Sequence, residues 1–195
     1  MEIKEKIKVG FCITGSFCTF ERAINEIENL CNKGYEVQVV MSEFSKKTDT
    51  RFGRAADITR KIREITNKEI IDSIEKAEPI GPKKMFDILI VAPCTGNTMG
   101  KFVSGIYDGC VLMAIKSHLR NERPVLIGLS TNDALGASAK SFGMLLNMKN
   151  MYFIPVRQDD PVNKPKSLVA AFELIEAAME KALENKQIQP ILLGS

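Results

Sequence analysis

The chain has 195 residues, a formal net charge of +3 and a hydrophobic content of 45%. This length suits one well-packed domain, so we expect a single domain over residues 1–195. Charged residues make up an ordinary 26%, and no basic stripe interleaved with aromatic residues indicates nucleic-acid binding. The first residues have the pattern of neither a signal peptide nor a membrane span.

Cysteine and histidine usage indicates the compartment and argues against a metal site. The chain has a single histidine, and none of its cysteines forms a C-x-x-C pair. An odd number of unpaired cysteines is typical of a reducing cytoplasm, and the spacing fits no zinc site. The five cysteines are Cys12, Cys18, Cys31, Cys94 and Cys110.

The first half of the chain has the pattern of a strand, a helix and a second strand. An apolar run at residues 7–13 predicts the first strand, and three-four apolar spacing predicts a helix from about Thr19 to Gly34. The second strand is predicted at residues 37–41. Together these elements predict a βαβ unit.

Residues 43–85 are more polar and predict two helices and a turn. Helical spacing runs over residues 55–65 and again around residues 70–74, before Pro79 and Pro82 break the pattern. The many basic residues here are spread among acids. We interpret them as a solvated helix face rather than an anion site.

The second half continues the alternation of strands and helices. Its uninterrupted apolar run at residues 88–92 predicts a strand covered on both faces, and Asn97 or Thr98 could cap the next helix. Ser167 could cap the final helix, which extends to Ala182. The apolar tail could dock on another subunit or fray. The other predicted elements are helices at 99–106, 111–119 and 134–148 and strands at 124–129 and 151–156.

This order predicts an α/β fold that is Rossmann-like (flavodoxin-like), with three α/β/α layers around a central parallel sheet. Ligands of such sheets bind at the carboxyl ends of the strands, where glycine, hydroxyl and amide groups collect in this sequence. These groups suit a phosphate monoester, so we expect a mononucleotide. Neither G-x-G-x-x-G nor a P-loop is present. The candidate residues are Thr14, Gly15, Ser16, Ser42, Pro93, Cys94, Thr95, Gly96, Asn97, Thr98, Ser130 and Asn132.

Three motifs carry a resemblance to a known family. T-G-S after the first strand, serine after the second, and A-P-C-T-G-N-T followed by K-F-V-S-G-I-Y-D resemble the flavoprotein family of homo-oligomeric, flavin-containing cysteine decarboxylases. The resemblance implies FMN as cofactor, with Gly15, Ser16 and Ser42 at its phosphate and residues 95–98 at its ring and ribityl chain. It also implies a homo-oligomer, a trimer or a dodecamer.

The sequence departs from the decarboxylating members of that family. It lacks their histidine before the third strand, and of their P-x-M-N-x-x-M motif only Asn132 remains. His118 is expected on a helix, at the surface or half-buried, so histidine-dependent decarboxylation is not expected. A helix N-terminus could lower the pKa of Cys94, but we expect a small packing residue there.

Four stretches resemble one branch of the family found in spore-forming bacteria: V-G-F-C-I-T-G-S-F-C-T-F, A-P-C-T-G-N-T, S-T-N-D-A-L-G-A-S-A-K and R-Q-D-D-P-V-N-K-P-K-S-L-V-A. This resemblance implies the cytoplasm of a sporulating mother cell and a nicotinamide-dependent A subunit, which could supply NADP. It also implies an oxidation that aromatises a six-membered ring bearing two carboxylates.

Such a substrate needs cations for its carboxylates and a base. The candidate cations are Arg157, Lys164 and Lys140. The base stays open among Asp133, Asp159 and Asp160, and no catalytic residue is assigned. Two other functions remain open: a non-catalytic scaffold for the A subunit with a degenerate flavin pocket, and an FMN-dependent decarboxylase of a small acid.

Overall fold

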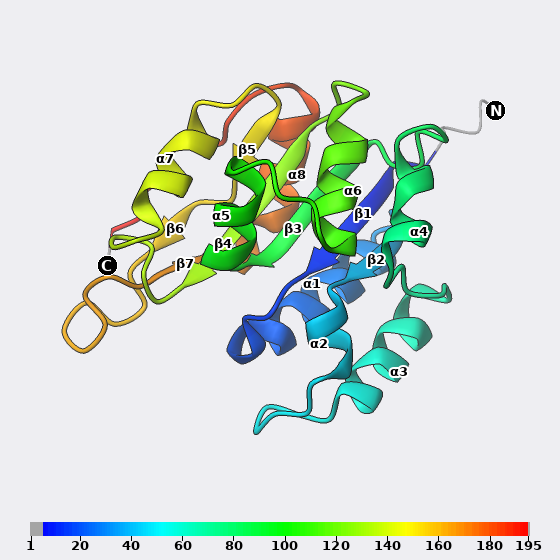
Figure 1. Cartoon of the computed structure of the whole chain (residues 1–195), viewed down its shortest axis with the longest axis horizontal. Coiled ribbons are helices and arrows are strands. Elements are labelled where there is room, and N and C mark those ends of the chain that lie inside the picture. Colours follow the sequence, from blue (N-terminus) through cyan, green and yellow to red (C-terminus); the bar gives the residue numbers. More distant parts are fainter. Residues whose placement is uncertain (1–5, 195) are drawn as a thin grey trace.

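A parallel sheet forms the centre of the computed structural model, which describes residues 6–194. In spatial order, the parallel strands of this part are β2 (Glu36–Met41), β1 (Lys8–Ile13), β3 (Ile88–Cys94), β4 (Val125–Thr131) and β5 (Met151–Phe153) (Figure 1). This is the strand order of flavodoxin-like doubly wound sheets. The predicted fold class is confirmed.

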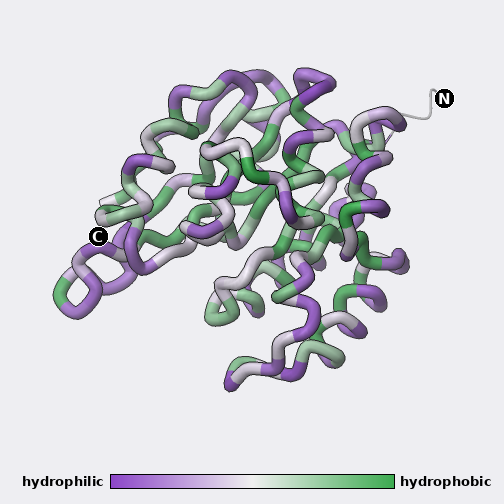
Figure 2. The backbone as a smooth tube through the Cα atoms, in the orientation of Figure 1, coloured by the Kyte–Doolittle hydropathy of each residue, from purple (hydrophilic) through white to green (hydrophobic). Residues whose placement is uncertain are grey.

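The central strands are buried because helices cover both faces of the sheet. Every residue of β3 is buried, and its side chains alternate between two apolar cores. Ile88 and Ile90 belong to one core, and Leu89 and Val91 belong to the other. Figure 2 shows hydrophobic stretches in the middle of the molecule and hydrophilic ones on its outer turns.

The helices fall into two groups, one for each face. The predicted helices at 55–65 and 111–119 are confirmed, as is the one beginning near Thr19. One core contains residues of α1 (Phe20–Asn32), α3 (Ala55–Thr66) and α8 (Ile175–Leu183), and the other contains residues of α4 (Ile74–Ala77), α5 (Gly96–Val103), α6 (Cys110–Leu119) and α7 (Ala139–Leu146). Short 3-10 helices are η1 (Phe17–Thr19), η2 (Glu78–Ile80) and η3 (Phe172–Leu174).

The segment after β2 differs from its prediction. It opens with a short helix, α2 (Glu43–Lys47), which Ser42 caps by accepting a hydrogen bond from the Ser45 backbone N–H. The helix expected around residues 70–74 begins only at Ile74. Ile71 instead exchanges backbone hydrogen bonds with β2, because β2 is an edge strand whose N–H and C=O groups need partners.

The helix predicted at 134–148 begins only at Ala139. The residues before it form a turn around Asp133, whose carbonyl oxygen accepts hydrogen bonds from the N–H groups of Gly136 and Ser138 at 2.8 and 3.2 Å. The Asp133 carboxylate also accepts a hydrogen bond from the Ser138 hydroxyl. These bonds close a turn at Asp133, and the helix begins only after Ser138.

The strand predicted at 151–156 is split in two. β5 is parallel to the first half of β4 and ends at Phe153, whereas β6 (Val156–Arg157) pairs with a different strand. Pro155 stands between them and has no N–H to continue the ladder. Apolar composition predicted the extended chain correctly, but it could not predict the change of partner.

Ser167 does not cap a helix, so that prediction is wrong. The residues after it form β7 (Leu168–Ala170), which runs antiparallel to Ser130 and Thr131 of β4 and also to β6. Because β5 stops early, the second half of β4 is open for this pairing. The final helix, α8, therefore begins only at Ile175.

The C-terminal tail pairs with its own chain. The N–H of Val156 donates to Ile191, and the N–H of Leu193 donates to Val156, each at 2.9 Å. The tail thus contacts β6 of the same molecule, an arrangement that the sequence did not indicate. Within residues 6–194, no helix combines the length and the apolar character that crossing a membrane requires.

His118 is deeply buried, contrary to the expected surface or half-buried position. It lies on α6 with 1% of its surface exposed, and its Nε2–H donates to the Pro124 carbonyl oxygen at 3.0 Å. Burial lowers the pKa of His118 to about 4, because the charged form would lose its hydration. The residue is a neutral core histidine far from the predicted ligand loops.

The lowered pKa of His118 leads us to expect a loss of stability in acid. Its pKa of about 4 in the folded protein lies below the unfolded value, so the unfolded state takes up the proton first as pH falls from about 6.5 to 4. We expect wild type to lose about 3 kcal/mol more unfolding free energy than His118→Gln over this range. Urea unfolding at each pH measures the difference. Equal losses in both proteins would contradict it.

Candidate functional site

A cavity of about 530 Å³ lies at the carboxyl edge of the sheet. It is lined by the turn between β1 and α1, the end of β4, and the connection from β6 to β7. This is the edge at which open α/β sheets bind ligands. The predicted site residues that line it are Gly15, Ser16, Thr95, Ser130, Asn132 and Lys164.

A smaller cavity of about 150 Å³ is lined by four more of the predicted ligand residues. Thr14, Ser42, Asn97 and Thr98 line it, together with Phe44. The Phe44 ring also covers Gly15, where a Cβ atom would lie 3.3 Å from Phe44 Cδ1. The predicted single site is therefore divided between two cavities, with Phe44 beside the division. Pro93, Cys94 and Gly96 line neither cavity.

Thr14 joins the ends of β1 and β3. Its buried hydroxyl donates to the Pro93 carbonyl oxygen at 2.8 Å and accepts from the Thr95 N–H at 3.1 Å. The Thr14 N–H also donates to Pro93, at 3.2 Å. These bonds use the hydroxyl for structure, so Thr14 positions the loop that follows β3.

Thr95 is the N-cap of α5, instead of the predicted Asn97 or Thr98. Its hydroxyl oxygen accepts from the Thr98 N–H at 3.3 Å, and the two threonine hydroxyls lie 3.0 Å apart. The helix consequently begins at Gly96, earlier than the predicted residue 99. This places the first amides of α5 directly after β3.

Gly96 allows α5 to approach the end of β4 closely. A Cβ atom there would lie 3.0 Å from Asp133 Oδ1 and 3.1 Å from Thr131 Oγ1, and closer still to the Ser138 hydroxyl. Glycine is therefore required at this position by packing, since any side chain would displace that polar cluster.

Asp133 is an anchored anion and a poor candidate for the base. Its Oδ1 accepts from the Thr131 hydroxyl at 2.6 Å and from the Ser138 hydroxyl at 2.9 Å. The bond from Thr131, followed by that from Ser138, lowers the pKa of Asp133 below its usual value. The carboxylate stays ionised and fixes the turn after β4.

Ser16 and Ser130 bring together the loop after β1 and the end of β4. Their hydroxyl oxygens lie 2.8 Å apart although the residues are 114 positions apart in the chain. Both line the larger cavity. The pair gives this cavity two adjacent hydroxyls beside Gly15. Such hydroxyls can form hydrogen bonds with a phosphate group or with a sugar hydroxyl.

Cys94 is a packing residue, as expected, and its pKa is not lowered. The thiol is buried, and burial raises its pKa to about 12, because desolvation disfavours the thiolate. The suggested effect of the helix N-terminus is therefore wrong. Cys94 carries no nucleophilic role at neutral pH.

The three predicted cations are not brought together. Lys164 lines the larger cavity, where its ammonium lies 3.3 Å from Asp159. Arg157 lies outside both cavities, 2.5 Å from Glu173, and Lys140 is exposed on α7 and lines neither cavity. Of the three, only Lys164 is at the candidate site.

The other two candidate bases lie in the same connection as Lys164. Burial would raise the pKa of Asp159, but hydrogen bonds from Ser167 and Lys164 outweigh it and lower the pKa. The Asn163 N–H lowers the pKa of Asp160. Both carboxylates are therefore ionised at neutral pH.

Arg51 and Phe52 also line the larger cavity, and sequence reasoning did not select them. They lie in the connection between α2 and α3, within the segment whose charges predicted a solvated face. The available signal was an arginine next to an aromatic residue and Gly53, in a short turn between two helices.

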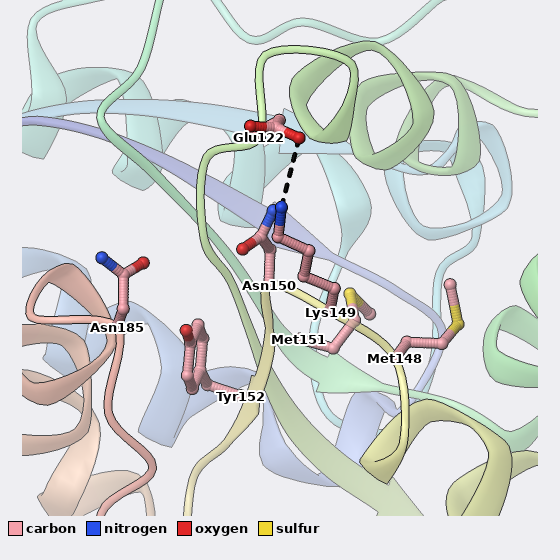
Figure 3. Close-up of a pocket in the computed structure, with 7 residues that line it drawn as sticks. All are labelled: Glu122, Met148, Lys149, Asn150, Met151, Tyr152 and Asn185. Atoms are coloured by element: carbon pink, nitrogen blue, oxygen red, sulfur yellow. Dashed lines mark hydrogen bonds and ion pairs between the residues drawn. The ribbon is translucent and has the colours of Figure 1, made fainter.

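A third cavity, of about 560 Å³, lies at the opposite edge of the sheet, where β5 begins (Figure 3). Lys149 and Glu122, which line it, form an ion pair at 3.2 Å, and Tyr152 and Asn185 also line it. This amino edge lacks the strand-end loops that hold ligands in such folds. We therefore place the candidate site at the carboxyl edge.

Across residues 6–194, no group of three or more His, Cys, Asp or Glu side chains comes together in a way that could hold a metal ion. The candidate site offers hydroxyls, amides and aromatic rings. Its donor set therefore suits an organic anion.

Comparison with known proteins identifies the family. A family model described as Flavoprotein matches residues 2–187. The chain belongs to the Flavoprotein family. This membership confirms the resemblance given by the three motifs at the strand ends.

Within the Flavoprotein family, the chain is 48% identical over 186 residues to the B subunit of dipicolinate synthase from Bacillus subtilis, covering 95% of this chain and 93% of that protein. It is 43% identical to the corresponding B subunit from Bacillus halodurans, whose crystal structure superposes with a TM-score of 0.89 over 97% of each chain.

A more distant solved structure shares the fold. Burkholderia xenovorans DmrB, crystallised in complex with FMN, is 16% identical, with a TM-score of 0.65 over 94% of this chain and 98% of its own. At this identity the likeness concerns the fold alone.

Thr14→Val tests whether Thr14 joins the two strand ends. The substitution keeps the shape but leaves the half-buried Thr95 N–H without its acceptor, so we expect a loss of about 1–3 kcal/mol in unfolding free energy. Thr48→Val is the control, because the Thr48 hydroxyl donates to Phe44 in an exposed position, and we expect a change within about 0.5 kcal/mol. Urea unfolding of both variants measures the effect, and equal changes would contradict the assigned role.

Proposed function

We propose that this protein is the B subunit of a dipicolinate synthase, which binds FMN and works with an A subunit. The pair would oxidise dihydrodipicolinate to dipicolinate, pyridine-2,6-dicarboxylate, in the mother-cell cytoplasm of a sporulating bacterium. The observation that carries the proposal is the 48% identity to a protein of that name over 95% of this chain. The cavity at the carboxyl edge supports it, because this edge binds ligands in such folds.

The residues at this edge fit FMN. Gly15 lets a phosphate approach the backbone, and the hydroxyls of Ser16 and Ser130 face the same cavity. The α5 amides after Thr95 supply further donors, at the end of a helix that favours negative charge. Asn97 and Thr98, which line the adjoining cavity, would contact the ring and ribityl chain. When bound, FMN would supply a hydride acceptor.

The reaction removes a hydride and a proton from the substrate ring, which then becomes aromatic. Oxidised flavin, or oxidised NADP held by the A subunit, would supply the hydride acceptor, and a carboxylate near the cavity would take the proton. Asp133 and Asp159 both line the cavity and both already accept hydrogen bonds, so the base stays open between them. Lys164 beside Asp159 would hold a substrate carboxylate.

A second function follows from Phe44, whose ring lies over Gly15 beside the division between the two cavities. If this arrangement persists with ligand, the flavin pocket is closed and the chain acts as a scaffold for the A subunit. The A subunit would then carry the chemistry. The two functions differ in whether the purified protein binds FMN.

Absorption spectroscopy separates these functions. We expect the protein to retain a flavin band after incubation with FMN and desalting. Asn97→Ala should weaken FMN binding about tenfold, because one polar contact is lost. Asn29→Ala is the control, since Asn29 is exposed on α1 and lines neither cavity at the carboxyl edge.

Activity with the A subunit completes this test. A yellow protein that is required for dipicolinate formation supports the proposed function. A colourless protein that still restores dipicolinate formation would support the scaffold instead. Carbon dioxide released from a supplied small acid would contradict both.

A further inference from the structure

The connection between α2 and α3 has a fixed shape. Thr50 and Gly53 exchange backbone hydrogen bonds, both at 3.1 Å, and the Thr50 hydroxyl oxygen accepts from the Phe52 N–H at 3.1 Å. Asp49 accepts from the Ala55 N–H at 2.8 Å and so ties the turn to the start of α3. Gly53 has φ of 143°, a conformation that favours glycine. The turn therefore holds Arg51 and Phe52 at its tip.

Arg51 and Phe52 form a flat, charged surface at the larger cavity. The guanidinium carbon of Arg51 lies 4.8 Å from the centre of the Phe52 ring, and both residues line the cavity. Phe52 is 49% exposed. Cation–π contact orients the guanidinium while leaving its N–H donors available.

The other charged groups at this cavity already have partners. Lys164 lies 3.3 Å from Asp159, and Asp133 accepts hydrogen bonds from two hydroxyls. In the part of the chain that the structure describes, no carboxylate lies within ion-pair distance of Arg51. Arg51 therefore brings an uncompensated positive charge to this cavity.

We propose that Arg51 binds a carboxylate of the planar aromatic dicarboxylic acid in this cavity, with Phe52 as the residue that orients its guanidinium. The assignment rests on the proposed function and deepens it, because it replaces Arg157 and Lys140 with a cation that lines the cavity. Lys164 lies on a different connection, from β6 to β7 (Figure 1), and also lines the cavity, so it is the candidate for the second carboxylate.

The chemistry of this cavity fits a planar dicarboxylate. A guanidinium binds a carboxylate through two parallel N–H···O hydrogen bonds, in the plane of both groups. The Phe17 and Phe52 rings offer flat apolar contact to an aromatic ring. A neutral ligand would leave Arg51 uncompensated, whereas a dicarboxylate neutralises it.

Titration calorimetry with pyridine-2,6-dicarboxylate tests this inference, on the purified protein and again with its A subunit. We expect Arg51→Gln to raise Kd about tenfold to a hundredfold, because a charge-assisted bidentate contact is lost. Arg51→Lys keeps the charge without the planar fork, so its Kd should lie between those of wild type and Arg51→Gln. Arg54→Gln is the matched control, since Arg54 is exposed nearby and does not line the cavity.

FMN retention of the same variants distinguishes the two possible anions. We expect Arg51→Gln to retain FMN as wild type does. Loss of FMN with unchanged dicarboxylate affinity would assign Arg51 to the flavin phosphate and overturn the inference, while the proposed function would stand. Unchanged affinity for both ligands would also overturn it. If wild type binds neither FMN nor pyridine-2,6-dicarboxylate, both alone and with its A subunit, the inference and the proposed function both fail.

Discussion

The buried hydroxyl of Thr14 is the contact on which the arrangement of the carboxyl edge depends. It bonds to Pro93 and Thr95 at once and so joins the end of β1 to the start of α5. With this junction fixed, α5 begins at Gly96 and can lie against the turn after β4. Leaving a buried N–H or C=O unpaired at this junction would cost about 1–3 kcal/mol of stability. The hydrogen bonds of Thr14 therefore hold the carboxyl ends of β1, β3 and β4 in one arrangement.

Sequence patterns predicted those parts of the fold that depend on local periodicity. β3 could be predicted from five consecutive apolar residues, and α1 from its three-four spacing, because a buried strand and a helix with one buried face each leave a regular apolar pattern. β7 could not be predicted, since it exists only because β5 ends at Phe153 and leaves the second half of β4 open. The late start of α7 likewise depends on the bonds that Asp133 accepts.

The location of the candidate site followed from the sequence, but the use of its side chains did not. Glycine and hydroxyl residues after several strands predicted a ligand edge, because parallel strands end on one side. Which cation remains available depends on pairing that sequence does not reveal. Glu173 pairs with Arg157, whereas among residues 6–194 Arg51 contacts the Phe52 ring and forms no ion pair. Most ion pairs of residues 43–85 join two residues of that same segment, such as Lys46–Asp72 and Arg63–Glu69, and the sequence did not distinguish Arg51 from those paired charges.

The charges at this edge constrain what can bind there. The pKa of Asp133 and that of Asp159 are both lowered by hydrogen bonds, so both carboxylates stay ionised at neutral pH and would repel an anion that met them alone. Lys164 offsets Asp159, and Arg51 is left to attract the ligand. Because Arg51 is exposed to solvent, its attraction is screened by salt, whereas the apolar contact with Phe52 is not. An aromatic anion can use both contacts, and this combination favours a planar dicarboxylate over a small inorganic ion.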